Sequence, residues 1–173
     1  MAITTTLSQV KLAKDLKAKA NPYFVIGRST AWTNEKLPPI PNKSTTSLEE
    51  VIGYKKVESV FLCRPIKPNE TTNYQRFYYN NKEWVKVPDA NAEAEGATYV
   101  GYEAKLNPTD FPLGMYRQVG IHIGLTPKSG ITKTNLLPSE VNSKGYLHAY
   151  ENTKPINRIE NVTITERFII SVE

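Results

Sequence analysis

The sequence predicts a mainly β protein: an antiparallel β-sandwich or open barrel with an N-terminal amphipathic helix and long loops. Ten tyrosines, two tryptophans and twelve prolines favour strands separated by well-defined turns. Short apolar runs bounded by turn residues recur along the chain, whereas helical periodicity does not recur after the N-terminal segment. The last run, 162–172, alternates apolar and polar residues, which is typical of a strand with one face on a core.

The helix is expected to begin at Thr6, because Thr6 and Gln9 match a capping box. It is expected to run to about Ala20, and Pro22 prevents its continuation. One face carries the apolar side chains Leu12, Ala13, Leu16 and Ala20. These signals predict an N-terminal helix within residues 1–21 and a single β-sandwich-like domain over residues 22–173.

The strands of that domain are expected where apolar runs lie between turn residues. Asn80-Asn81-Lys82 predicts a tight hairpin, because asparagine tolerates a positive φ. The polar segments 29–47 and 126–144 are expected to be long loops. The predicted strands cover residues 23–28, 57–63, 74–79, 83–87, 98–106, 115–124, 145–152 and 162–172.

The sequence contains no pattern that indicates catalysis, a cofactor or a metal. Its histidines are His122 and His148, and His122 alternates with isoleucines, which predicts a place on the non-core face of a strand. Cys63, within V-F-L-C-R, is expected to be a small buried apolar group. No nucleophile elbow, Walker loop or dinucleotide fingerprint occurs. We therefore expect no enzymatic activity, no cofactor and no metal site.

Charge and hydropathy argue against nucleic-acid and membrane partners. The net charge of +5 is modest, and the charged residues are scattered rather than clustered. No segment approaches the roughly 18 consecutive apolar residues of a membrane span, and the N-terminal residues lack the apolar region of a signal peptide. A single cysteine allows no internal disulfide. The expectation is a soluble protein made inside a cell.

The predicted hairpin has two interpretations. Its aromatic residues alternate with basic ones and would suit stacking on sugars or bases. The favoured alternative is a core face with a tyrosine-rich surface, and tyrosine and tryptophan are also enriched in protein–protein hot spots. Tyr78 and Trp84 are therefore candidate contact residues. The aromatic set is Tyr74, Phe77, Tyr78, Tyr79 and Trp84.

Three segments resemble a known family when they are taken in order. Residues 23–41 read Y-F-V-I-G-R-S-T-A-W-T-N-E-K-L-P-P-I-P, with an apolar run, G-R-S, a tryptophan and a proline-rich loop. Residues 115–121 read M-Y-R-Q-V-G-I, and residues 150–156 read Y-E-N-T-K-P-I, before the apolar ending F-I-I-S-V. This order resembles the small dimeric wedge subunit in baseplates of T-even-type contractile-tailed phages. That protein is considerably longer, so this chain would be a reduced form.

The resemblance implies a structural, non-enzymatic virion component that is made in the host cytoplasm and built into the tail baseplate. It implies a homodimer and contacts with other baseplate wedge proteins. Arg28 is expected to place its planar donor fork on a carboxylate or on loop carbonyls, and Trp32 to pack on the loop's prolines or on a partner. Arg117, Tyr150 and Asn152 are the candidate interface residues of the later segments.

One alternative function uses the hairpin rather than the matched segments. In that hypothesis the chain is a carbohydrate- or receptor-binding β-module of a phage tail, with residues 74–84 as a stacking platform.

Overall fold

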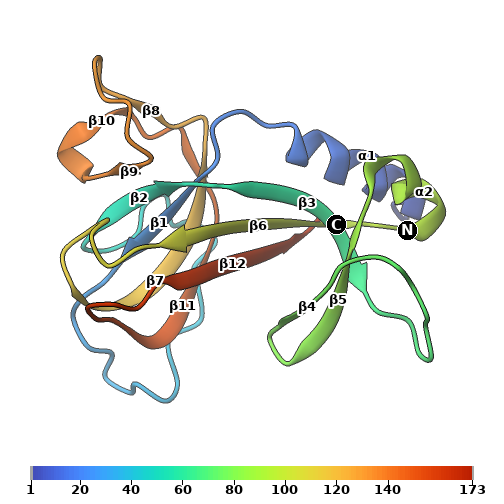
Figure 1. The fold of residues 1–173 in the computed structure, drawn as a ribbon, viewed down its shortest axis with the longest axis horizontal. Helices are drawn as coiled ribbons and strands as arrows, with labels where there is room; N and C mark the ends of the chain where they lie inside the picture. Colours follow the sequence, from blue (N-terminus) through green and yellow to red (C-terminus); the bar gives the residue numbers. More distant parts are fainter. Residues whose placement is uncertain (1, 173) are drawn as a thin grey trace. The chain divides into compact units, whose positions relative to one another are not determined.

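The computed structural model describes residues 2–172 and confirms the predicted fold class. It contains 42% strand and 13% helix, with antiparallel sheets, one of them a half-barrel, and an N-terminal helix (Figure 1). The chain forms two compact units. The helical unit comprises the residues up to Lys19, Ser59–Glu103 and the segment from Arg167 onward. The loop unit comprises Ala20–Glu58 and Ala104–Glu166.

The N-terminal helix of the helical unit, α1, spans Thr6–Lys17. The helix begins at Thr6 as predicted and ends earlier than expected. Its N-cap is Thr5, whose hydroxyl accepts a hydrogen bond from the Ser8 amide at 3.3 Å, so the cap lies one residue before the predicted Thr6–Gln9 capping box. The buried face is formed by Val10, Ala13 and Leu16, whereas Leu12 is 45% exposed. The expected apolar face was therefore slightly misplaced around the helix axis.

A five-stranded sheet with the order β12-β6-β3-β5-β4 accompanies this helix. Asn80 and Asn81 both adopt positive φ and join β4 to β5 in a two-residue turn, so the predicted hairpin is confirmed. A short helix, α2 (Ala92–Glu95), follows the turn η1 (Asp89–Asn91). The strands are β3 (Ser59–Pro65), β4 (Arg76–Tyr79), β5 (Lys82–Val87), β6 (Tyr99–Leu106) and β12 (Ile164–Ser171).

The core of the helical unit contains Phe61, Cys63, Phe77 and Trp84. Cys63 is fully buried, and burial raises the pKa of its thiol to about 12. The expectation of a buried, apolar cysteine is therefore confirmed. A thiol with a raised pKa carries little thiolate at neutral pH.

The loop unit has a second five-stranded antiparallel sheet, with the order β11-β7-β1-β2-β9. Its core cluster includes Tyr23, Val25, Tyr54, Leu125 and Leu136. Within 126–144, which was expected to be one long loop, the chain forms β9, the turn η2 (Pro138–Glu140) and a two-stranded pair of β8 and β10. The strands are β1 (Tyr23–Gly27), β2 (Gly53–Lys56), β7 (Gly114–Ile123), β8 (Thr126–Pro127), β9 (Asn135–Leu136), β10 (Val141–Ser143) and β11 (Tyr146–Arg158).

The predicted position of His122 is wrong. Strand β7 is buried on both faces from Tyr116 onward, so the alternation of His122 with isoleucines does not place it toward solvent. The His122 side chain is 2% exposed, its Nδ1 lies 2.8 Å from the Lys144 carbonyl oxygen, and the Tyr54 ring meets it edge-on. Burial lowers the pKa of His122, so the imidazole is a neutral core group.

The expected division into a helix and a single β-domain over 22–173 stays a prediction. Helix α1 groups with the sheet of the helical unit, and the chain passes between the units after Lys19, Glu58, Glu103 and Glu166. Strands β6 and β12 each contribute residues to both units.

Candidate assembly surface: a loop braced on strands β7 and β11

The connection between β1 and β2, residues 28–52, has no helix or strand, yet its side chains tie it to β7 and β11. We call this segment the braced loop. It follows Gly27, which ends β1 as expected. A Cβ on Gly27 would lie 2.6 Å from the Glu49 carbonyl oxygen, so glycine lets the two ends of the loop approach each other. There the Arg28 amide donates to the Glu49 carbonyl at 2.7 Å.

Arg28 and Trp32 form the first contact of the braced loop. The Arg28 guanidinium lies 3.9 Å from the centre of the Trp32 ring, pairs with the Glu49 carboxylate and donates to the Ala31 carbonyl. This confirms the expected use of its planar fork. Trp32 is 7% exposed, and its indole nitrogen donates to the Thr153 carbonyl of β11 at 2.9 Å. Trp32 therefore anchors the loop to a strand of its own chain.

Arg117, on β7, provides the second contact. Its side chain is buried, and its Nη2 lies 2.6 Å from Oε1 of Glu35, while its Nη1 donates to the Ser29 carbonyl. The hydrogen bond from Arg117 is the main cause that lowers the pKa of Glu35, and the same bond raises the pKa of Arg117. Both groups are thus charged at neutral pH, and the pair holds the first part of the loop against the sheet.

Two amide side chains provide the third contact of the braced loop. Gln118 and Asn152 lie opposite each other in the β7–β11 ladder, and the Gln118 amide nitrogen donates to Oδ1 of Asn152 at 2.9 Å. Asn152 in turn donates to the Pro39 carbonyl at 2.9 Å. On the other side, Oε1 of Gln118 accepts from the Glu49 amide at 2.8 Å. These two amide side chains connect the middle of the braced loop with its end.

Tyr150 holds the part of the loop that follows the prolines. Its hydroxyl accepts a hydrogen bond from the Asn42 amide at 2.6 Å and lies 3.0 Å from the Thr45 hydroxyl. Glu50 closes the loop by accepting from the amide of Thr30 at 2.9 Å and from its hydroxyl at 2.6 Å. These bonds lower the pKa of Glu50 to about 2.

Between these contacts the loop exposes two large apolar side chains. Leu37 is 74% exposed and Ile40 is 92% exposed. Neither was among the predicted contact residues, although the string L-P-P-I-P contains both. Glu35, Gln118 and Thr153 were also missed, because their contacts depend on which strands become neighbours.

The structure thus brings Arg28, Trp32, Arg117, Tyr150 and Asn152 together around the braced loop. Tyr78 and Trp84 belong to the β4–β5 hairpin of the helical unit. Tyr78 is 70% exposed, whereas Trp84 is buried and its indole nitrogen donates to the Tyr79 carbonyl at 3.3 Å. Burial of Phe77 and Trp84 confirms the interpretation of the hairpin as a core face with surface tyrosines.

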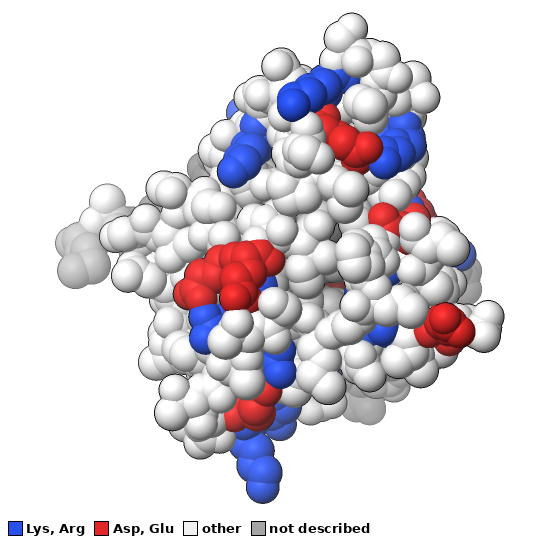
Figure 2. All heavy atoms as spheres, turned by 90° about the vertical axis from the view of Figure 1, so that its left-hand side faces the viewer, with Lys and Arg blue, Asp and Glu red and all other residues white. Residues whose placement is uncertain are grey.

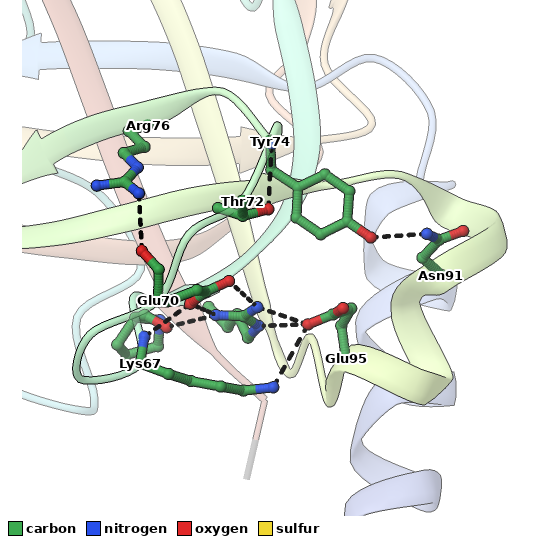
Figure 3. Close-up of polar contacts among 9 residues, drawn as sticks. Lys67, Glu70, Thr72, Tyr74, Arg76, Asn91 and Glu95 are labelled. Atoms are coloured by element: carbon green, nitrogen blue, oxygen red, sulfur yellow. Dashed lines mark hydrogen bonds and ion pairs between the residues drawn. The ribbon is translucent and has the colours of Figure 1, made fainter.

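The helical unit contains a separate polar network around Arg64. This guanidinium lies 2.7 Å from Oε1 of Glu70 and 2.5 Å from Oε2 of Glu95. Figure 3 shows how Lys67, Glu70 and Glu95 converge, and how Tyr74 reaches toward Asn91. The bond from Arg64 is the main cause that lowers the pKa of Glu70 to about 2. The network fixes the segment between β3 and β4.

Metal-ligating groups, charged areas and apolar helices are the remaining features of the described residues to consider. No group of three or more His, Cys, Asp or Glu side chains in residues 2–172 is placed to hold a metal ion. On the face in Figure 2, acidic and basic side chains lie in small mixed groups rather than in one large area of a single sign. Within the described chain no helix is both long enough and apolar enough to span a bilayer.

A β scaffold that fixes a loop with exposed apolar side chains suits a protein that acts through contacts with other proteins. Residues 1–172 match the family described as "Baseplate wedge 3 tail fiber network component", and the chain belongs to this family. The chain is also 41% identical over 174 residues to "Virion protein 3" of Enterococcus phage phiEF24C, an alignment that covers 100% of this chain and 96% of that protein.

The family membership confirms the resemblance to baseplate wedge proteins that the sequence motifs indicated. The chain is a structural component of a phage tail baseplate and is located in the virion. Membership also implies that it interacts with other baseplate proteins.

Proposed function

We propose that this chain is a wedge subunit of the baseplate, which acts without catalysis by holding neighbouring baseplate proteins in position. The observation that carries the proposal is the family match over residues 1–172. The braced loop adds a physical reason, because loops on a rigid scaffold are suited to carry contacts while the sheet keeps them in place.

We further propose that the subunit pairs with a second copy of itself. This step follows from the resemblance of its three segments to the dimeric wedge subunit. In both kinds of contact, Arg28, Trp32, Arg117, Tyr150 and Asn152 would act by fixing the braced loop. Tyr78 would contact a partner directly, and Trp84 would support the hairpin from its core.

Co-expression with the other baseplate proteins of the same phage tests both proposals. The first expected result is a stable complex that contains this chain and at least one other baseplate protein. The second is that the chain alone has the mass of a dimer. Light scattering after size-exclusion chromatography measures both masses. A monomeric chain that still enters the complex would contradict the homodimer only. A chain that joins no baseplate protein would contradict the wedge role.

The alternative of a carbohydrate- or receptor-binding module has weaker support. A stacking platform needs exposed rings, but of the five aromatic residues of the hairpin Tyr78 alone is largely exposed. Glycan binding that is lost on replacement of Tyr78 would favour this alternative.

A further inference from the structure

One exposed stretch of the braced loop has a composition of its own. Residues 36–43 read K-L-P-P-I-P-N-K. Ile40 is the most exposed large apolar side chain in the described part of the protein, and Leu37 is 74% exposed. Exposure of both apolar side chains to water is unfavourable, because apolar surface has a lower free energy when it is buried. Burial against another molecule would remove that unfavourable exposure.

This segment is already ordered before any partner arrives. Pro38, Pro39 and Pro41 restrict the backbone torsions. Asn152 binds the Pro39 carbonyl at 2.9 Å, and Tyr150 binds the Asn42 amide at 2.6 Å. Binding would therefore require little further loss of conformational entropy, which favours affinity.

The charges beside the apolar side chains have one sign. Lys36 and Lys43 are exposed, and neither forms an ion pair with any residue that the structure describes. The acidic neighbour Glu35 is directed toward Arg117 instead. Residues 36–43 thus offer two exposed apolar side chains between two positive charges without an ion-pair partner among the described residues.

We propose that residues 36–43 are a docking segment that enters an apolar, aromatic-lined groove with an acidic rim on another protein of the baseplate. Pro38 and Pro41 form a P-x-x-P pattern, and such segments bind aromatic-lined grooves as a polyproline helix. A polyproline helix has three residues per turn, so in that bound conformation Leu37 and Ile40 would lie on the same face. An acidic rim would complement Lys36 and Lys43. The inference rests on the proposed wedge function and adds the chemistry of the partner.

Other classes of partner suit the segment less well. A membrane surface binds through a larger apolar area or a cluster of basic residues. Nucleic acid is bound through a denser positive footprint than two lysines provide. Both classes are included as outcomes of the test.

The test uses the full chain and the separately purified baseplate proteins of the same phage, with affinity measured by calorimetry. Ile40→Asp and Leu37→Asp are each expected to weaken binding by roughly thirty-fold, the size of a hot-spot effect. Lys36→Glu with Lys43→Glu is expected to weaken binding and to reduce its dependence on salt. Melting temperatures should stay unchanged, because all four side chains are exposed.

Matched controls separate docking from general surface effects. Ile159 is 49% exposed and Lys128 is exposed, and both lie outside the braced loop. Ile159→Asp and Lys128→Glu are therefore expected to bind like the unmodified chain.

The outcomes distinguish the inference from the proposed function. If a baseplate protein binds the chain and the Leu37 and Ile40 variants bind equally well, the docking inference is wrong and the wedge role stands. If no baseplate protein binds, the wedge role fails as well. If the variants instead abolish binding to phosphatidylglycerol vesicles or to a DNA duplex, the protein-groove inference is overturned.

Discussion

At the scale of single residues, buried cations in the loop unit are matched to backbone and carboxylate acceptors. Lys55 lies 2.8 Å from Oδ2 of Asp110, with both side chains buried. Arg158 is 3% exposed and uses carbonyl oxygens, including those of Pro112 at 2.7 Å and Asn107 at 2.8 Å. Because these contacts come from the turn before β7, Arg158 sets the path by which the chain enters that strand.

Glu166 is the contrasting case of a buried acid. It lies on β12, accepts a hydrogen bond from the Tyr116 hydroxyl and is 9% exposed. Burial is the main cause that raises the pKa of Glu166 above its usual value of 4.5, and the nearby Glu151 carboxylate raises it further. The folded state therefore binds a proton at pH values where the unfolded state has lost it, so this group contributes less stability as pH rises through the folded pKa.

We predict that Glu166→Gln makes stability less dependent on pH. The glutamine oxygen can still accept from Tyr116 but cannot ionise, so the variant should gain stability relative to the unmodified chain as pH rises above 4.5, the ordinary pKa of this carboxyl. Urea unfolding at several pH values measures this difference. The loss of stability toward acid should remain in both proteins, because Glu50 and Glu70 have a pKa of about 2 in the fold. Parallel profiles above pH 5 would contradict the assignment to Glu166.

At the scale of elements, the β7–β11 ladder carries the candidate assembly surface. Its register places Gln118 opposite Asn152, and Trp32 and Tyr150 attach the loop to β11. Strand β11 begins just after Gly145, which has a φ of 60°. A Cβ at Gly145 would overlap the carbonyl oxygen of Ile123, so the start of the ladder depends on glycine.

We predict that Gly145→Ala destabilises the protein by more than about 2 kcal/mol, because backbone strain and a clash with backbone add together. Gly130→Ala is the matched control, since Gly130 also has a positive φ of 82° but nothing lies within 4 Å of its Cβ position. It should cost about 1 kcal/mol from strain alone. Denaturant unfolding gives both values. Equal losses would mean that the Gly145 backbone moves away without penalty.

At the scale of the whole molecule, each unit contains one of the two tryptophans. Trp84 lies in the helical unit and Trp32 in the loop unit. The chain passes between the units after Lys19, Glu58, Glu103 and Glu166, whereas separable domains are usually joined by few crossings. Strands β6 and β12 continue from one unit into the other along the chain.

We predict that residues 22–173 unfold as one cooperative domain. Variants with Trp32→Phe or Trp84→Phe keep one fluorescent reporter each, and within either variant the denaturant midpoint from fluorescence should coincide with that from circular dichroism. Each variant serves as the control for the other, because only the position of the reporter differs. Probe midpoints that differ within one variant would show that the units unfold separately and that the chain contains two domains.

The predictable parts of the fold were those that depend on local patterns. Asparagines 80 and 81 indicated their turn because two consecutive positive φ values suit few other residues. The alternation around His122 was misleading, because periodicity reports a change of face but not whether the second face is covered. In α1, the side that faces the core carries Val10, Ala13 and Leu16, so Leu12 lies at the edge of the apolar face rather than within it.

By itself, the sequence determined that this protein is a β-rich chain with an N-terminal helix and without a recognisable catalytic motif, and three of its segments resemble those of baseplate wedge proteins. These properties depend on composition and on neighbours along the chain. Only the tertiary structure decided that Arg28, Trp32 and Arg117 hold a loop rather than standing free on the surface. Trp32 meets Thr153 across 121 residues, and Arg117 meets Glu35 across 82. Such contacts are set by strand order and register, which local spacing does not encode.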